Sequence, residues 1–338
     1  MDLFFAILLF IISTLIVATV GTYLTKVADQ LADLTGLGEA MFGAIFLGGV
    51  TSLPGIVTSV VAAYNGHPEL AVSNAVGGIA AQTFFLSIAD ITYKKTNLEH
   101  AAASFTNLMQ GVLLIGLLAL VIIGMSGPDL SVLNIHPFSI LIIGGYIVGS
   151  KMISKAKDRP MWSPRITRAT VRDAPDKKNI KLSLKKVVAK FVLSAIVVGI
   201  AGFAIAKTGI VIAAETGLSE SFVGVLFTAV ATSFPELIVA ISAVKRGALT
   251  LSVGNIIGGN SFDVMFIAFA DIAYGKGSIL HAITQNQVFI MAITMLMTSI
   301  LILGLLHRER EGFGKIGWES LTIIIVYFIG NGVLFFLT

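Results

Sequence analysis

Two stretches of this chain, TSLPGIVTSV at residues 51–60 and TSFPELIVAI at residues 232–241, share one frame. Each begins with Thr-Ser, followed by an apolar residue and a proline. The residue after the proline is Gly55 in the first stretch and Glu236 in the second. The Thr-Ser-x-Pro pattern is therefore repeated, whereas the charge that follows it is present in only one copy.

The shared frame belongs to a longer internal repeat with a constant offset, which pairs Thr51 with Thr232. Residues 35–93 and 216–274 are identical at 21 of 59 positions without a gap. The identical positions include Asn74 and Asn255, and the copies end in ADITY and ADIAY. Self-similarity of this length indicates that the two halves of the chain repeat one structural unit.

The composition of the chain is that of a membrane protein. Of its 338 residues, 56% are hydrophobic and 12% are charged, and the mean hydropathy is +0.92. A soluble domain is typically about one quarter charged, so this chain has too few polar groups to cover a water-facing surface. The absence of cysteine excludes disulfides and thiolate metal sites. The net charge of +4 does not indicate nucleic-acid binding, because the basic residues lie in loops between apolar runs.

Ten apolar runs are long enough to cross a bilayer, which requires about 20 residues per helix. We therefore predict an all-α membrane protein with ten transmembrane helices. The runs lie at about 3–24, 38–64, 68–93, 101–125, 132–150, 186–207, 218–243, 249–274, 283–306 and 317–337.

The repeat and the helix count together predict an inverted topology. Five helices separate the two copies, and because five is odd, the second copy enters the membrane from the opposite side. We expect two inverted five-helix repeats, at residues 1–150 and 186–338, joined by a linker at 151–185. The segment 151–186 holds 12 of the 23 Lys and Arg residues, and basic loops favour the cytoplasmic side. We thus expect a multi-pass protein of a prokaryotic plasma membrane, with a cytoplasmic linker and both termini outside.

The repeated core carries residues suited to ion chemistry. A proline in mid-span kinks or opens a helix, and the freed carbonyl groups must find partners inside the membrane. Glu236 and Asp263 lie deep in the second copy, where a carboxylate costs about 2.5–3.5 kcal/mol and therefore usually faces a site. Carboxylate, hydroxyl and amide oxygens suit hard cations such as Ca²⁺ and Na⁺. A pair of protonated, hydrogen-bonded structural acids is the alternative interpretation.

These motifs resemble a known family. The segment ATSFPELIVAISAVKRGALTLSVGNIIGGNSFDV at 231–264 resembles the second α-repeat of sodium/calcium exchangers, in the cation/calcium antiporter superfamily. Residues 50–83 resemble a diverged first α-repeat. The ten-helix inverted layout is also similar to that family, so the resemblance covers nearly the whole chain. It implies exchange of Ca²⁺ for Na⁺ or another cation by alternating access.

The same resemblance implies a set of cation ligands. The family's two second-repeat ligand positions fall on Glu236 and Asp263, and the corresponding first-repeat positions fall on Gly55 and Gln82. Gly55 removes a carboxylate, and Ile79 stands where the second copy has Asn260, which leaves ion selectivity open. The candidate ligands are Glu236, Asp263, Thr232, Ser233, Asn255, Asn260, Thr51, Ser52, Gln82 and Asn74.

We expect a secondary active cation antiporter that is not an enzyme and uses no cofactor, with the lipid bilayer and the transported cations as its partners. Two alternatives remain open: a monovalent antiporter of the Na⁺/H⁺ type with weak or no Ca²⁺ transport, and a non-transporting protein that retains the scaffold. Asp90 and Asp271 recur near helix ends, where a structural role and a role in the ion pathway both remain open. The sequence does not indicate an oligomeric state.

Overall fold

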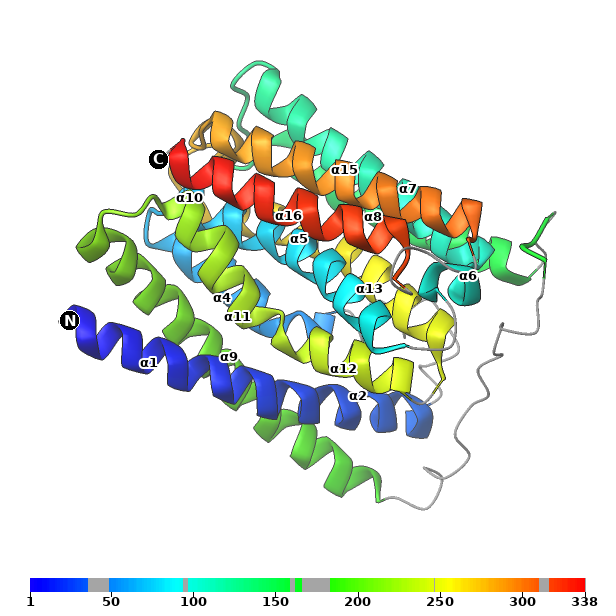
Figure 1. Cartoon of the computed structure of the whole chain (residues 1–338). Coiled ribbons are helices and arrows are strands. Elements are labelled where there is room, and N and C mark those ends of the chain that lie inside the picture. Colours follow the sequence, from blue (N-terminus) through cyan, green and yellow to red (C-terminus); the bar gives the residue numbers. More distant parts are fainter. Residues whose placement is uncertain are drawn as a thin grey trace.

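The structure is a computed structural model that describes residues 1–35, 49–93, 97–158, 162–165, 183–245, 247–309 and 316–337. Within these ranges the regular elements are helices, and the chain forms an all-helical bundle (Figure 1). Most of the predicted linker 151–185 and the first part of the predicted helix 38–64 lie outside the described residues.

The helices alternate between long spans and short connecting pieces. Those of the first half are α1 (Leu3–Ile16), a π-helical turn (Val17–Gly21), α2 (Thr22–Thr35), α4 (Leu53–Tyr64), α5 (Pro68–Thr92), α6 (Leu98–Ala102), α7 (Phe105–Ser126) and α8 (Pro137–Asp158). Those of the second half are α9 (Leu184–Thr216), α10 (Glu220–Phe222), a π-helical segment (Val223–Thr228), α11 (Ala229–Thr232), α12 (Phe234–Lys245), α13 (Leu249–Asp263), α14 (Met265–Tyr274), a 3-10 turn (Ile279–His281), α15 (Gln285–His307) and α16 (Trp318–Phe336).

The described helices are those of a multi-pass membrane protein. Eight are long and apolar enough to cross a membrane, and the bent pair Glu220–Thr232 and Phe234–Lys245 makes up to nine. The shorter apolar α4 falls within the remaining predicted run, 38–64. The all-α class is therefore confirmed, while the count of ten crossings stays a prediction.

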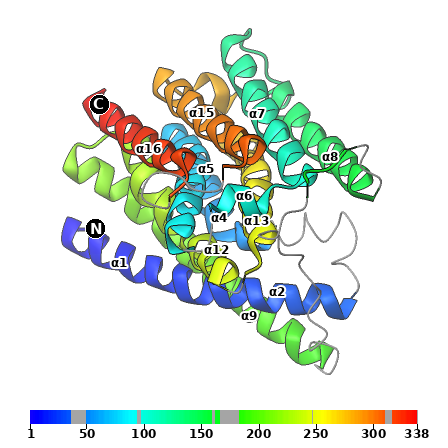
Figure 2. The same ribbon diagram turned by 45° about the vertical axis from the view of Figure 1, so that its right-hand side comes forward.

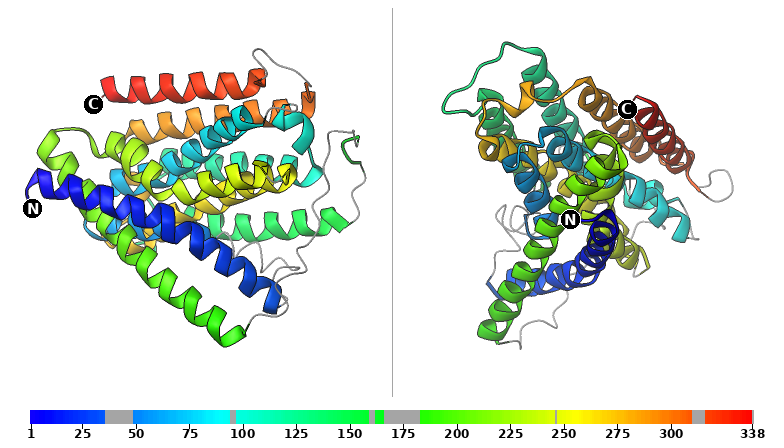
Figure 3. Two further views of the ribbon diagram at one scale, coloured as in Figure 1. Left: turned by 60° about the horizontal axis from the view of Figure 1, so that its bottom comes forward. Right: turned by 90° about the vertical axis from the view of Figure 1, so that its left-hand side faces the viewer.

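Two segments form the centre of the bundle. In the spans Pro68–Thr92 and Ser252–Tyr274, 78% and 72% of the most apolar window is buried, against 17% in the span that begins with α1. Figure 2 shows α4, α5 and α13 surrounded by the other helices, and α1 packs against α9 on an outer face (Figure 3). Both ends of the chain lie at the same end of the bundle (Figure 3).

Residues that are equivalent in the repeat contact one another at this centre. Gln82 donates a hydrogen bond to Oδ2 of Asp263, its own equivalent, at 2.7 Å. Asn260 donates to the carbonyl oxygen of Ile79, again its equivalent, at 3.4 Å. The two copies therefore meet where α5 crosses the end of α13.

Equivalent glycines also pack against equivalent prolines. A Cβ atom on Gly21 would lie 2.7 Å from Cγ of Pro235, and a Cβ on Gly202 would lie 2.8 Å from the carbonyl oxygen of Pro54. Glycine at these two positions lets the outer helix of one half approach the proline of the other half closely. Each half thus supports the broken helix of its partner.

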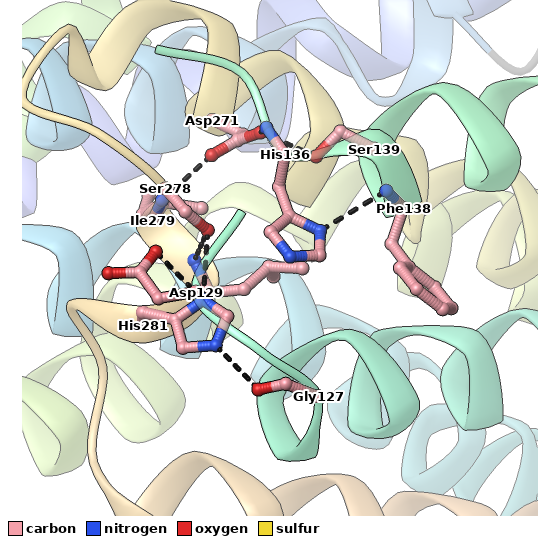
Figure 4. A network of polar contacts seen from close by, with 10 residues as sticks. Gly127, Asp129, His136, Phe138, Ser139, Asp271, Ser278, Ile279 and His281 are labelled. Carbon is pink, nitrogen blue, oxygen red and sulfur yellow. Dashed lines mark hydrogen bonds and ion pairs between the residues drawn. The ribbon is translucent and has the colours of Figure 1, made fainter. Parts of the chain in front are cut away.

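Asp271 ties the end of α14 to the start of α8. Its carboxylate accepts hydrogen bonds from the backbone N–H of Ile279 at 2.7 Å, from that of His136 at 2.7 Å and from Oγ of Ser139 at 2.6 Å (Figure 4). His136 immediately precedes α8, so one side chain of the second half fixes a helix of the first half.

Asp90 makes the equivalent connection at the other end of the bundle. It accepts hydrogen bonds from the backbone N–H of Leu98 at 2.8 Å and from that of Gly317 at 3.2 Å. By the offset of the repeat, Leu98 and Gly317 correspond to Ile279 and His136, the two backbone donors to Asp271. Both aspartates therefore have a structural role, and neither lines the cavity described below.

Candidate cation site

The repeated Thr-Ser-x-Pro stretches interrupt two helices near the centre of the bundle. Ser52 (φ −85°, ψ 3°) precedes α4 and Ser233 (φ −97°, ψ 5°) separates α11 from α12, so both leave the helical conformation. The helix axis bends by 49° between Glu220–Thr232 and Phe234–Lys245. The kink expected from Pro235, which lacks an N–H donor, is confirmed.

A small cavity lies between the two breaks. Its volume is about 10 Å³, enough for one particle of the size of a water molecule or a dehydrated cation. Both halves of the repeat supply its walls. The lining residues are Ser52, Gly55, Asn74, Gly78, Gln82, Thr232, Ser233, Glu236, Asp263 and Phe266.

Asp263 is the more enclosed of the two carboxylates in the cavity. Its side chain is buried at the end of α13. Oδ1 accepts a hydrogen bond from Oγ of Ser52 at 2.6 Å, and Oδ2 accepts the bond from Gln82. Both donors come from the first half of the chain, so this carboxylate is held across the interface between the repeats.

Glu236 is the second carboxylate, in the first turn of α12. The residue is only half-buried, but its Oε2 atom is buried and has no hydrogen-bond partner among the described residues. The described ion pairs involve neither Glu236 nor Asp263, so no Lys or Arg neutralises them there. A buried carboxylate oxygen without a donor is costly unless a proton or a cation occupies its place.

The unpartnered oxygen atoms are of the kind that hard cations accept as ligands. Oε1 of Gln82, in the cavity, is also buried without a described partner, and so is Oδ1 of Asn260, which does not line the cavity. The described residues contain no group of three or more His, Cys, Asp or Glu side chains that could hold a metal ion. Two carboxylates would therefore have to share a cation with amide and hydroxyl oxygens, ligands that Ca²⁺ and Na⁺ accept.

Seven of the ten candidate ligands line the cavity: Glu236, Asp263, Thr232, Ser233, Ser52, Gln82 and Asn74. Three others are placed elsewhere. Asn260 donates to Oγ1 of Thr83 at 3.0 Å as well as to Ile79, Asn255 is exposed, and Thr51 is half-buried beside the first break.

Phe266 and Gly78 line the cavity although the sequence interpretation did not select them. Gly78 lies next to Oγ of Ser233, which a Cβ on Gly78 would approach to 3.5 Å. Phe266 follows Asp263 by three residues, close to one helical turn, and this spacing was the available signal. An aromatic residue in an apolar run is nevertheless more often part of the core, and only the fold shows that its ring reaches the cavity.

Comparison with known sequences identifies the family. The profile described as "Sodium/calcium exchanger protein" matches residues 5–149 and 186–336, which is most of the chain. The chain is 24% identical over 312 residues to the putative antiporter CaxA of Alkalimonas amylolytica, covering 91% of this chain and 92% of CaxA. It is 27% identical over 144 residues to the sodium/calcium exchanger MaX1 of Methanosarcina acetivorans, covering 43% of this chain and 39% of MaX1.

Solved structures share the fold at low sequence identity. The H⁺/Ca²⁺ exchanger CAX superposes with a TM-score of 0.69 at 15% identity, covering 98% of this chain and 86% of that chain. The sodium-calcium exchanger NCX_Mj superposes with a TM-score of 0.62 at 18% identity, covering 98% of this chain and 99% of that chain. With an all-helical membrane bundle and a family profile that spans both halves, the chain belongs to the sodium/calcium exchanger family of the cation/calcium antiporter superfamily.

Proposed function

We propose that this protein is a secondary active antiporter, not an enzyme, that exchanges Ca²⁺ for Na⁺ or H⁺ at the cavity between the two helix breaks. The observation that carries the proposal is the pair of carboxylates, Glu236 and Asp263, beside the unpartnered oxygen of Gln82. Named relatives and structural neighbours include both a sodium-calcium exchanger and an H⁺/Ca²⁺ exchanger, which supports Ca²⁺ as a substrate and leaves two choices for the counter-ion.

In this proposal the chain crosses the membrane ten times as two inverted five-helix repeats. The contacts between equivalent residues, such as Gln82 with Asp263, support a pseudo-twofold relation through the site. Because the site lies where the halves cross, a small rotation of the outer helices against the centre would expose it alternately to each side. The basic linker 151–185 would be cytoplasmic and both termini outside.

A monovalent antiporter is the second candidate, and Gly55 favours it. The first copy offers no carboxylate opposite Glu236, so the donor set carries at most two negative charges. Two charges neutralise one divalent ion or two monovalent ions, and the exchange is then electroneutral. A membrane potential, worth about 2.3 kcal/mol per charge per 100 mV, would have little effect on such a cycle.

The test is cation flux in proteoliposomes that contain purified protein with Glu236→Gln. We expect this variant to fold and to lose Ca²⁺ exchange, because the neutral amide cannot balance a cation inside the membrane. Glu215→Gln, the same change at an exposed position at the end of α9, is the matched control and should transport as the unaltered protein does.

The outcome separates the candidates. Ca²⁺ uptake driven by a Na⁺ or H⁺ gradient supports the first, and uptake of Na⁺ against H⁺ without Ca²⁺ supports the second. Full activity in well-folded Glu236→Gln protein would show that ions bind elsewhere. An absence of flux for all three ions in the unaltered protein would support a non-transporting scaffold.

A further inference from the structure

Gly55 faces the ring of a buried phenylalanine. A Cβ atom on Gly55 would lie 2.8 Å from Cε2 and 3.5 Å from Cζ of Phe266. The shorter separation is below a carbon–carbon contact, for which about 3.5–4.0 Å is optimal. The ring therefore occupies the direction in which any side chain at position 55 would leave the backbone.

The ring is held in place by its own neighbours. Phe266 is buried, and its ring packs edge-to-face against Phe262 with centroids 6.2 Å apart. Phe266 also lines the cavity together with Gly55, so it forms part of the wall on the first-repeat side. Close packing in a protein interior resists displacement of an aromatic side chain.

The equivalent phenylalanine of the first half takes a different place. Phe85 occupies the position of Phe266 in the repeat, but it packs against Phe234 with ring centroids 6.4 Å apart and does not line the cavity. The side chain of Glu236 reaches the cavity instead. At one of two equivalent places the cavity therefore receives a carboxylate, and at the other it receives an aromatic ring.

We propose that Phe266 is a specificity-determining residue that fills the place of a second glutamate and limits the site to the cation charge that two carboxylates neutralise. This inference rests on the proposed function and names the feature that sets the charge of its site. With the ring in place, the charged ligands reach the ion from the second repeat alone, and the first repeat offers only neutral groups such as Gln82 and Ser52. The site thus suits one divalent ion or an equal charge of monovalent ions.

The test combines substitutions on both sides of this contact. Gly55→Glu alone should fold with a lower Tm and without tighter Ca²⁺ binding, because the ring blocks the new side chain. Gly55→Glu with Phe266→Ala removes the block and adds a third carboxylate, and its Kd for Ca²⁺ should fall by about tenfold or more, as expected for a charge added close to a divalent ion. Calcium binding is measured by isothermal titration in detergent, and stability by thermal unfolding.

Two controls separate charge from space. Gly55→Gln with Phe266→Ala has the same shape without the charge and should not tighten Ca²⁺ binding. Gly55→Glu with Phe85→Ala removes the equivalent ring, which lies away from Gly55, and should behave as Gly55→Glu alone. Tighter Ca²⁺ binding by Gly55→Glu alone would overturn the proposal. Equal Ca²⁺ binding by the two double variants with Phe266→Ala, one with Gly55→Glu and one with Gly55→Gln, would also overturn it.

A labelling experiment covers the case in which the double variant Gly55→Glu with Phe266→Ala does not fold. The chain has no cysteine, so Gly55→Cys introduces a single thiol. A small methanethiosulfonate reagent should label this thiol faster when Phe266→Ala is added, and Ca²⁺ should slow that labelling. Equal labelling rates with and without Phe266→Ala would contradict the blocking role. If the unaltered protein neither binds nor exchanges cations, the proposed function fails; if it does and only these comparisons fail, the role of Phe266 alone is wrong.

Discussion

The two halves of the cavity share a backbone and differ in chemistry. Both present a Thr-Ser-x-Pro break supported by a glycine of the opposite half, Gly202 beside Pro54 and Gly21 beside Pro235. The second half adds two carboxylates, whereas the first half adds two amides, a hydroxyl group and the space that Phe266 fills. The frame of a repeated site thus depends on small residues and prolines, while its charge can change in one copy without loss of the frame.

The largest effect, a loss of Ca²⁺ exchange, is expected from Asp263→Asn, which removes one of the two charges in the second half of the cavity. The structure should tolerate the change, because Gln82 can rotate its amide so that its unpartnered oxygen accepts from the amide introduced at position 263. We expect near-normal Tm and loss of Ca²⁺ exchange in proteoliposomes. Exchange at the normal rate would show that Asp263 carries no essential charge.

The charge can then be moved to the other half. Asp263→Asn combined with Gln82→Glu exchanges the two groups across the contact between equivalent residues, so the site keeps its total charge. We expect part of the lost exchange to return, since the carboxylate and the amide still face each other. Gln82→Glu in the otherwise unaltered protein is the control, because it adds a third carboxylate instead of restoring the second. A double variant as inactive as Asp263→Asn would mean that the side of the cavity matters as well as the charge.

An intermediate effect, on stability, is expected from substitution of the equivalent asparagines Asn74 and Asn255. Asn74 is buried and donates to Gly55 O at 3.2 Å and Oγ of Ser59 at 2.9 Å, and it accepts from Oγ1 of Thr228 at 2.8 Å. Asn74→Ala should cost about 2–3 kcal/mol of unfolding free energy, because buried groups lose partners. Asn255 is exposed, so Asn255→Ala should change stability by less than about 0.5 kcal/mol. Thermal unfolding of both variants checks this order, which equal losses of Tm would contradict.

The smallest effect concerns the helix connections made by Asp90 and Asp271, which differ in their neighbours. Near Asp90, the buried Glu99 accepts a hydrogen bond from Oγ of Ser320 at 3.0 Å and lies close to the carboxylate of Glu319. Arg308 donates a hydrogen bond to the carbonyl oxygen of His100, which lies on the same short helix as Glu99. Burial, reinforced by the charge of Asp90, raises the pKa of Glu99 from 4.5 to about 8.

This raised pKa makes the stability depend on pH in a defined direction. Between pH 4.5 and about 8 the unfolded chain has released the proton of Glu99 while the folded protein still holds it, so stability falls as pH rises and levels off above that range. Glu99→Gln stays neutral and should remove this loss. Its Tm relative to the unaltered protein should therefore be higher at about pH 9 than at about pH 5. A Tm difference that is the same at both pH values would contradict the assignment to Glu99.

Several features could be predicted from the sequence because they depend on local properties. The all-α membrane class follows from the length of the apolar runs, and the kink at Pro235 follows from the missing N–H. The prediction that Glu236 and Asp263 face a site follows from the cost of a carboxylate in a bilayer, which holds whatever the neighbouring helices are. The constant offset of the repeat also placed Gly55 opposite Glu236 before any contact was known.

Other features depended on how helices distant in the chain cross, and only the tertiary structure decided them. The contacts of Asp263 with Ser52 and Gln82 span 211 and 181 residues, and no local pattern contains the crossing angle that creates them. The same crossing leaves Asn255 exposed and directs Asn260 to Thr83, although both share the motif with the residues that line the cavity. Position 55 shows the difference most clearly: the sequence determined that a charge is missing there, and the packing of α14 against α4 determined that an aromatic ring stands in its place.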